Sequence, residues 1–588
     1  MSDEHDQRLA LVRSLPLFSG FTAAAQAEVA ELVEWFSFPG GVTLFEAGDA
    51  ADALYVVING CLGAFARMPS GERRLIARIA PGETVGEMAL LTGRPRNAAV
   101  VSLRDTELVR FSRDAFERLI VGHPSAMLDL ARLGVHRLER SRELAPSARS
   151  PRTLAILPQS PEVDAGGFAE GLVAELSQGR RVACVRPPAG ELPETQWFHS
   201  VEEQNDCVVY VAEPGVTPWS QFCVRQADAL LLLVQATTPP GRFAVLNEGR
   251  ESRATLQRAE LVLLHDGAIT RGAARGWLAR HEGMAHHHVR GPGDIARLAR
   301  LLTGRAVGLV LSGGAARGFA HVGVIRALRE HGIPIDLVGG TSIGAIVGAA
   351  AAAEWSFDEM RQRFHRTFVA ANPLGDYTLP VVSLVSGRRV NRLLEQEFGG
   401  LEIEDLPLPF FCCSTNLTQG KLVVHRTGEL WRWLRASIAI PGVLPPVTHA
   451  GEMYVDGGLM RNLPIDVLQE MGPGRVIAVD VTPGTALRVA QDSVEAPSVW
   501  RSLPFVGGGR SQQPGILHIL LRSAMVNSTA AAAALRERVD LLFRPPLEGL
   551  DLMDWGALER GAEVGYRHAR ERLRAADAPE WIQQALPA

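Results

Sequence analysis

The 588-residue sequence lacks the features that mark several common classes of protein. Its six cysteines include no C-x-x-C pair, the spacing typical of thiolate metal and redox sites. They lie in apolar, strand-like runs, so we expect buried, reduced thiols. A formal net charge of −5 leaves no basic excess of the kind that nucleic-acid binding depends on, and we expect no nucleic-acid partner. The six are Cys61, Cys184, Cys207, Cys223, Cys412 and Cys413.

Long apolar runs are also missing. The longest, IGAIVGAAAAAEW after Ser342, is shorter than the roughly 20 residues of a membrane span and rich in glycine and alanine, so it predicts a buried helix. The acidic N-terminus carries no basic segment followed by an apolar stretch, the pattern of a signal peptide. We therefore expect a cytoplasmic protein that meets a membrane, if at all, peripherally at its inner surface.

The pattern of the sequence changes along the chain, which is too long for one ordinary hydrophobic core. Residues 1–142 combine helical periodicity with short alternating runs and glycine turns, predicting an antiparallel β-roll with flanking helices. Residues 143–152, rich in Ser, Pro and Arg, read as a linker. Residues 153–303 repeat apolar strands and helices, which predicts a parallel α/β sheet. Residues 304–588 form a third block, again α/β.

The middle block has no glycine pattern for binding phosphate. Its first predicted strand is followed by PQSPEVDAGG, which matches neither G-x-x-x-x-G-K-[ST] nor G-x-G-x-x-G, so we interpret the block as a structural or regulatory spacer. His286, His287 and His288 are consecutive in a predicted strand. Because side chains alternate between the faces of a strand, these histidines are not expected to share a metal ion.

A candidate nucleophile lies in the third block. LVGGTSIGAIVG places Ser342 between Gly340 and Gly344, on a predicted turn from a strand into a helix, as in a nucleophile elbow. Upstream, VGLVLSGGAARG runs from a strand into a glycine-rich turn before a helix, where backbone N–H groups can stabilise negative charge. Together the two motifs predict an activated serine beside an anion-stabilising loop.

The proton acceptor for this serine is less evident. None of the downstream histidines lies in a clear loop motif after a strand. The stretch MYVDGG ends a short strand at Asp456, before two glycines. An aspartate facing the hydroxyl can act as general base if desolvation raises its proton affinity. From the residues alone, an ordinary turn at Asp456 and a histidine base both stay open.

In this order, the motifs resemble the patatin-like phospholipases, of the kind found in bacterial homologues of neuropathy target esterase, over about residues 306–570. The resemblance implies an α/β hydrolase domain with a Ser–Asp dyad and no catalytic histidine, in which Ser342 is the nucleophile and Asp456 the base. It further implies hydrolysis of fatty-acyl esters of (lyso)phospholipids without a required cofactor. The implied oxyanion hole comprises Gly313, Gly314 and Ala315, and the supporting motif positions are Arg317, Gly318, Gly340, Gly344, Gly457 and Gly458.

The chain departs from the family pattern in the glycine-rich loop. Family members often carry glycine where this chain has Ser312 and Ala315. Alanine at 315 is compatible with the loop if its φ is negative and unfavourable if it is positive. His321 also fits the family pattern, and we expect it to pack or to orient the loop rather than to act as base. The stretches RASIAIPGVLPPV (435–447) and RNLP (461–464) are typical of the family as well.

The first block resembles a cyclic nucleotide-binding domain over about residues 10–140, through APGETVGEMALLTGRPRNAAVVS (80–102). The resemblance implies that Glu87 binds the ribose 2′-hydroxyl and Arg96 the cyclic phosphate, with cAMP or cGMP as effector. The helix at 126–142 is then the natural relay. No helix-turn-helix follows, which argues against a transcription factor. Gly86, Asn97 and Ala98 complete the nucleotide-binding residues that the resemblance implies.

The main interpretation is a phospholipase that is regulated by a cyclic nucleotide, and two questions remain open beside it. The first is a catalytically weak or inactive signalling protein that binds lipid or a partner through the same folds. The second concerns segments 371–390 and 500–523, which are apolar, interrupted by Gly and Pro, and flanked by arginines. Each is either a lipid-facing lid or a packed loop with a core helix, and we favour packing. The expected partner is a (lyso)phospholipid or membrane surface, with a homo-oligomer left open.

Overall fold

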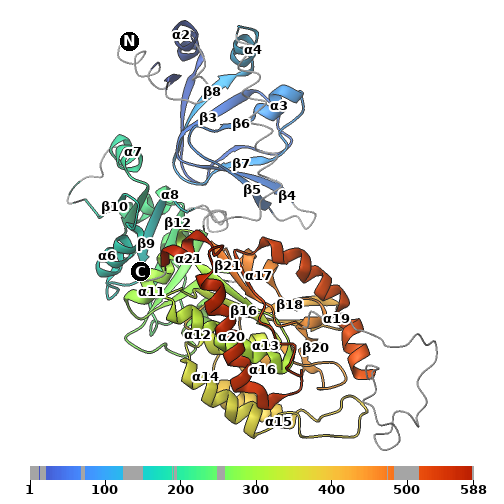
Figure 1. The fold of residues 1–588 in the computed structure, drawn as a ribbon. Helices are drawn as coiled ribbons and strands as arrows, with labels where there is room; N and C mark the ends of the chain where they lie inside the picture. The colour runs from blue at the N-terminus through green and yellow to red at the C-terminus, as the bar shows by residue number, and fades with distance from the viewer. Residues whose placement is uncertain are drawn as a thin grey trace, which may run out of the picture. The chain divides into compact units, whose positions relative to one another are not determined.

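Each block of the sequence folds around its own β-structure (Figure 1). The computed structural model describes residues 9, 12–13, 22–67, 73–122, 150–188, 190, 195–247, 258–281, 283–472, 474–482 and 516–585. The chain divides into two compact units, residues 1–266 with 276–299 and residues 267–275 with 300–588. No helix in these described ranges is both long and apolar enough to cross a membrane.

The N-terminal block is the predicted antiparallel β-roll, built from two four-stranded sheets in the orders β1-β8-β3-β6 and β2-β7-β4-β5. Apolar side chains of both sheets, among them Val57, Leu62 and Leu108, fill the space between them. The helices are α2 (Ala23–Leu32), α3 (Glu87–Thr92) and α4 (Arg113–Gly122). The strands are β1 (Glu34–Phe38), β2 (Thr43–Phe45), β3 (Ala53–Asn59), β4 (Leu62–Arg67), β5 (Arg73–Ile79), β6 (Thr84–Val85), β7 (Ala99–Ser102) and β8 (Thr106–Ser112). The expected relay helix at 126–142 lies outside the described residues.

The middle block is a six-stranded parallel sheet in the order β10-β11-β9-β12-β13-β14, as the continuous apolar runs predict. Its strands are β9 (Thr153–Pro158), β10 (Val182–Val185), β11 (Cys207–Val211), β12 (Ala229–Gln235), β13 (Arg258–Leu264) and β14 (Ala285–Val289). The helices are α6 (Ala165–Leu176), α7 (Thr195–Gln204), α8 (Pro218–Gln226), α9 (Ala244–Asn247), α10 (Ala273–Leu278) and α11 (Pro292–Leu302). All six cysteines of the chain are free, but the prediction that all are buried is wrong for Cys184. Cys184 is exposed because β10 is an edge strand.

The C-terminal block contains an eight-stranded mixed sheet in the order β19-β20-β17-β16-β15-β21-β22, with β18 also paired to β17. Its parallel strands are β15 (Val307–Leu311), β16 (Leu337–Thr341), β17 (Phe410–Asn416), β21 (Arg475–Val479) and β22 (Leu541–Phe543). The antiparallel additions are β18 (Lys421–His425), β19 (Val447–His449) and β20 (Glu452–Asp456). This antiparallel edge matters for function because β20 ends at Asp456.

Helices cover both faces of this sheet (Figure 1). The larger core lies beneath α12 (Phe319–Glu330), α13 (Ile343–Ala352), α14 (Phe357–Phe364), α15 (Arg388–Phe398), α16 (Leu430–Ser437) and α20 (Leu558–Arg574). The opposite face packs against α17 (Ile465–Glu470) and α19 (Ile516–Leu535), and the chain continues to α21 (Glu580–Ala585). Every residue of α13 is buried, which confirms the buried helix predicted after Ser342.

Segment 371–390 differs from the prediction. We expected its apolar residues to pack, but five large apolar side chains between Tyr377 and Leu384 are exposed. Prolines and single isolated bridges interrupt regular structure there, so these residues belong to no sheet or helix that could cover them. Of the other candidate lid, residues 500–515 lie outside the described residues, and the remainder begins α19.

Candidate active site

Ser342 lies on the sharp turn between β16 and α13, with φ +57° and ψ −129°. This backbone conformation is strained for any residue other than glycine, as nucleophile elbows require. The flanking glycines are needed because the backbone is crowded. A Cβ on Gly340 would lie 2.6 Å from the carbonyl of Gly344, and one on Gly344 would lie 2.5 Å from the carbonyl oxygens of Leu311 and Ser312. The G-x-S-x-G pattern therefore has a steric cause here.

The structure brings Ser342 and Asp456 together, although 114 residues separate them. The Ser342 hydroxyl donates to Asp456 Oδ2 at 2.8 Å, and the Gly458 N–H donates to Oδ1 at 2.7 Å. Ser342 is 8% exposed and Asp456 5%. Burial raises the pKa of Asp456 to about 6, against the opposing effect of these two hydrogen bonds. The carboxylate is thus ionised at neutral pH but has a much higher proton affinity than a solvated aspartate.

Segment 437–439, at the C-terminal end of α16, holds both members of this pair by hydrogen bonds. The Ser342 N–H donates to Ser437 Oγ at 2.9 Å, and the Asp456 N–H donates to the Ala439 carbonyl at 3.0 Å. From β17, Thr415 Oγ1 donates to the Asp456 carbonyl at 3.0 Å. The sequence marked RASIAIPG only as a family stretch, and it carried no signal that Ser437 reaches the elbow.

The glycine-rich loop passes directly beside Ser342. A Cβ on Gly313 would lie 3.0 Å from Ser342 Cβ and 2.6 Å from Asn462 Oδ1. The Gly313 N–H, however, donates to the Asn462 carbonyl at 3.1 Å, so it is not directed at the reacting atoms. The N–H groups of Gly314 and Ala315 form no hydrogen bond with any described residue. Of the three implied oxyanion donors, these two are the available ones.

Ala315 adopts φ +47°, the unfavourable case for alanine at this position. Left-handed backbone costs a residue with a Cβ about 1–2 kcal/mol. The loop is held in place from outside: Arg317 Nε donates to the Leu550 carbonyl at 2.9 Å, and the Ala316 N–H donates to the Leu552 carbonyl at 3.0 Å. These contacts of the C-terminal segment offset the strain of the loop.

The described histidines of this unit do not supply an alternative base. His321 is fully buried and donates from Nε2 to the Ser312 carbonyl at 2.9 Å, where burial lowers its pKa to about 4. It therefore orients the loop, as expected. His425 is engaged with Ser414 Oγ at 2.6 Å, and burial lowers its pKa to about 3. No described histidine hydrogen-bonds Ser342 or Asp456.

In the β-roll, the nucleotide cassette lies between β6 and β7. Gly86 has φ +93° and begins α3, whose first residue, Glu87, is buried. Arg96 is also buried: its Nη2 donates to Asp52 Oδ1 at 3.0 Å and to the Ala53 carbonyl at 2.7 Å, and its Nη1 donates to the Gly86 carbonyl at 3.1 Å. Of the two residues after it, Asn97 is exposed and Ala98 buried. The guanidinium implied to bind phosphate thus has protein acceptors in this structure.

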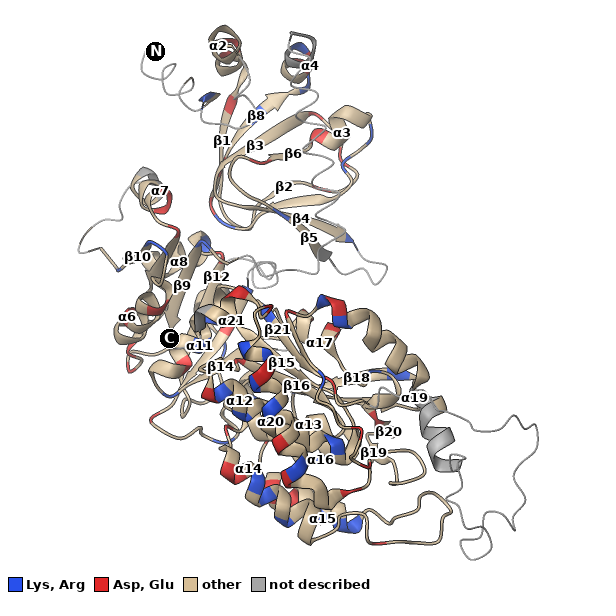
Figure 2. Cartoon of the chain, in the orientation of Figure 1, with Lys and Arg blue, Asp and Glu red and all other residues tan. Residues whose placement is uncertain are grey.

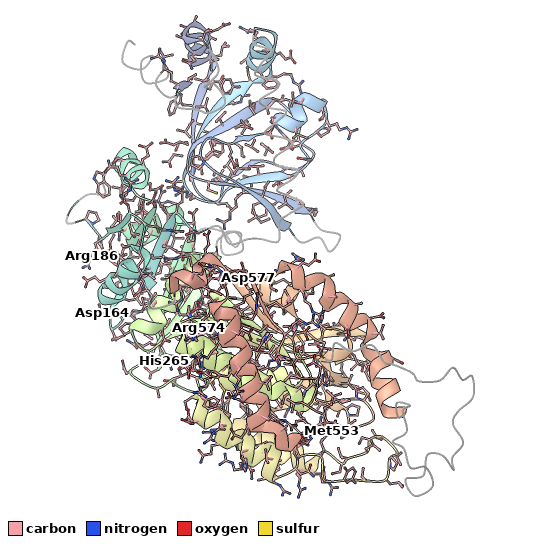
Figure 3. The ribbon with its side chains drawn as sticks, in the orientation of Figure 1. Asp164, Arg186, His265, Met553, Arg574 and Asp577 are labelled. Carbon is pink, nitrogen blue, oxygen red and sulfur yellow. The ribbon has the colours of Figure 1, made fainter. Side chains whose placement is uncertain are left out.

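The described part of the middle block contains no comparable constellation. At its sheet, His287 pairs with Glu260 at 2.7 Å and His288 with His265 at 2.8 Å, so the neighbouring histidines meet different partners. Asp164 caps α6 by accepting from the Gly167 N–H at 2.8 Å, which places the chain's own carboxylate where a phosphate would bind (Figure 3). Among the described residues, no group of three or more His, Cys, Asp or Glu side chains could hold a metal ion.

Comparison with protein families assigns a description to each block. Residues 35–123 match the cyclic nucleotide-binding domain, and residues 150–303 match the neuropathy target esterase family P-loop like domain. Residues 309–468 match patatin-like phospholipase. The third match spans the elbow, the glycine-rich loop and Asp456.

Curated relatives align along most of the chain. Lysophospholipase nte1 of Neosartorya fischeri is 31% identical over 92% of this chain and 42% of its own length. Patatin-like phospholipase domain-containing protein 6 of Pongo abelii is 30% identical over 92% of this chain and 44% of its own length. The chain thus spans less than half the length of these relatives. Among solved structures, the regulatory domain of Toxoplasma gondii PKA with cAMP aligns at 21% identity over 23% of this chain and 51% of that one, with a TM-score of 0.22.

Proposed function

We propose that the protein is a serine acyl hydrolase of (lyso)phospholipids. The proposal starts from its three domains, which match patatin-like phospholipase, the neuropathy target esterase family P-loop like domain and the cyclic nucleotide-binding domain. The observation that carries the proposal is the 2.8 Å hydrogen bond from Ser342 Oγ to the buried Asp456 carboxylate. A serine on a strained elbow, paired with a base of raised pKa, is an arrangement for nucleophilic catalysis. The names of the relatives, lysophospholipase and patatin-like phospholipase, point to the substrate class.

The first half of the reaction forms an acyl-enzyme. Asp456 accepts the Ser342 proton as Oγ attacks the ester carbonyl, and the carbonyl π-electrons move onto its oxygen. The N–H groups of Gly314 and Ala315 stabilise this oxyanion. When the tetrahedral intermediate collapses, the C–O bond to the glycerol breaks and Asp456 returns its proton to the leaving alcohol.

The second half releases the fatty acid. Asp456 accepts a proton from a water molecule as that water attacks the acyl carbonyl, and the same N–H groups stabilise the second oxyanion. Ser342 leaves as the C–O bond to the acyl group breaks, and it regains the proton. A pKa of about 6 suits a base that must hold and return a proton in each half.

Labelling with a fluorophosphonate probe tests the dyad. We expect wild-type protein to label and to hydrolyse a short-chain p-nitrophenyl ester, and Ser342→Ala to do neither. Ser200→Ala changes a serine of the first unit whose hydroxyl donates to the Trp197 carbonyl; it is the matched control and should behave as wild type. An unlabelled wild-type protein would favour the alternative of an inactive lipid- or partner-binding protein.

A second proposal concerns the β-roll: it binds cAMP or cGMP through Glu87 and Arg96 and regulates hydrolysis. The match to the cyclic nucleotide-binding domain and the buried positions of both residues support it. Arg96 Nη2 already donates to Asp52, whereas its Nε has no partner among the described residues, so a bound phosphate would compete with the Asp52 carboxylate for the guanidinium. A ligand that binds only the native state adds RT ln(1 + [L]/Kd) of stability, so a titration of thermal stability measures it. No shift at millimolar ligand would contradict binding, and unchanged lysophospholipid hydrolysis with ligand bound would contradict regulation.

A further inference from the structure

One loop of the second unit exposes a concentration of large apolar side chains. Tyr377 is 80% exposed, Leu379 79%, Val381 81%, Val382 66% and Leu384 40%. Exposed apolar residues scattered singly over a surface are ordinary, but five within eight consecutive residues form a patch that marks an interaction site. The patch therefore needs a partner.

The base of this loop is held firmly, so the exposure is a built feature of the fold. Tyr377 and Val385 form an antiparallel bridge across it. The Ser386 hydroxyl donates to Asp376 Oδ2 at 2.6 Å, and the Ser386 N–H donates to the Asp376 carbonyl at 2.8 Å. These contacts close the loop at its two ends and leave its tip, residues 379–382, projecting.

The same loop is joined to the segment that holds the dyad. The Leu384 N–H donates to the Gly442 carbonyl at 2.8 Å. Only a few residues earlier, segment 437–439 forms the hydrogen bonds to Ser342 and Asp456 described above. A membrane or partner bound by the loop would therefore lie on the same side of the domain as segment 437–439, which contacts Ser342 and Asp456.

Positive charge accompanies the apolar patch, and Figure 2 shows blue Lys and Arg positions on α15. Arg388, Arg389 and Arg392, at the start of α15, are exposed, and none forms an ion pair with a described carboxylate. Cations at the N-terminal end of a helix oppose its dipole, so the stability of α15 does not account for them. Asp376, the one carboxylate of the loop, is engaged by Ser386 and by the Arg389 N–H.

We propose that residues 377–384 and these three arginines dock the protein on an anionic phospholipid bilayer. The proposal rests on the proposed function, since it names the surface from which the lipid substrate is taken. Apolar side chains with flanking cations suit the interfacial region of a bilayer, where the former enter the acyl boundary and the latter meet headgroup phosphates. A second copy of this chain fits less well, because a two-fold contact through this patch would bring two sets of arginines together.

Vesicle sedimentation tests the docking loop. We compare wild type with the triple variant Leu379→Ser, Val381→Ser, Val382→Ser on phosphatidylcholine vesicles with and without phosphatidylglycerol. We expect the variant to bind the anionic vesicles at least about tenfold more weakly, because three apolar side chains no longer enter the interface. Wild type should bind the anionic vesicles better than the neutral ones, and added salt should reduce that difference.

Two further variants separate the causes. Changing Arg388, Arg389 and Arg392 to Gln should remove most of the preference for anionic vesicles. The matched control Ile76→Ser, Trp197→Ser alters two exposed apolar residues of the first unit and should bind as wild type. Equal vesicle binding by wild type and the loop variant would overturn the proposal. So would a loop-dependent, concentration-dependent dimer that forms in place of vesicle binding.

Two substrates distinguish this proposal from the proposed function. For the loop variant, hydrolysis of vesicle-embedded lysophospholipid should fall about as far as vesicle binding, relative to hydrolysis of a soluble p-nitrophenyl ester. A parallel loss on both substrates would assign the loop to the catalytic fold and overturn docking. Ser342→Ala protein should still bind vesicles. If wild type binds through the loop but hydrolyses neither substrate, docking stands and the proposed function fails.

Discussion

The dyad and the nucleotide cassette both place a buried charged side chain beside a glycine-bearing turn, yet they treat that charge differently. Asp456 accepts one backbone N–H and the Ser342 hydroxyl, and burial raises its pKa to about 6. Arg96 instead donates to two carbonyls and to Asp52. In the first site burial raises the proton affinity of the carboxylate, whereas in the second site both Nη groups of the guanidinium already have protein acceptors. A motif thus identifies the residues, and the hydrogen bonds determine whether they are ready to act.

The largest expected effect is at Asp456. Asp456→Asn keeps the shape of the side chain but removes the base, so kcat/KM for the short-chain ester should fall by about 10³-fold or more. Thermal unfolding should show a folded protein. Asp577→Asn, at an exposed partner of Arg572, is the control and should retain full activity. A near-normal rate for Asp456→Asn would contradict the role of Asp456 as the base, and with it the difference proposed between the two sites.

A smaller loss is expected from Ser437→Ala. It removes the acceptor of the Ser342 N–H, and a buried N–H without a partner costs about 1–3 kcal/mol. If this free energy destabilises the conformation of the elbow at Ser342, kcat should fall about tenfold to a hundredfold with little change in KM. Ser437→Thr, which keeps a hydroxyl, should recover much of the rate. An equal fall in KM would argue against a role in positioning the nucleophile.

The pH dependence sharpens the contrast without mutation. The raised pKa of Asp456 means that the base is protonated, and inactive, below about pH 6. The log of kcat/KM should therefore rise with pH to a plateau, with its midpoint near 6 and a fall of about tenfold per pH unit on the acid side. The control is the thermal stability over the same range, which separates titration from unfolding. A midpoint near 4, the ordinary value for an aspartate, would contradict a desolvated base.

The smallest effect is expected at the cassette. Asp52→Asn removes the carboxylate that competes with phosphate for Arg96. Because the Asp52 carboxylate is itself exposed to solvent, the affinity for cAMP or cGMP should rise only about two- to fivefold. Thermal-shift titration measures the change. Glu34→Gln is a matched control because Glu34 pairs with Arg110, which Asp52 also contacts, but does not reach Arg96. Equal affinities in all three proteins would show that the ion pair does not restrain Arg96.

Much of the fold and part of the site could be predicted because their signals are local. The apolar runs of the middle block predict its six parallel strands, and the glycines around Ser342 predict the elbow. The prediction that loop 377–384 packs is wrong, because an apolar composition does not tell whether neighbouring elements cover it. The prediction that Cys184 is buried is wrong for a related reason, because its strand lies at the edge of the sheet.

By itself, the sequence determined where chain geometry requires particular residues: glycines at 340 and 344, a serine between them, and an aspartate where β20 ends. Only the tertiary structure decided three hydrogen bonds. Ser437 Oγ accepts from the Ser342 N–H, the Asn462 carbonyl accepts from the Gly313 N–H, and the Asp52 carboxylate accepts from Arg96. These partners are distant in sequence and interact through single hydrogen bonds. Such contacts leave no periodic or spacing pattern, because they arise only when separate strands and helices are packed together.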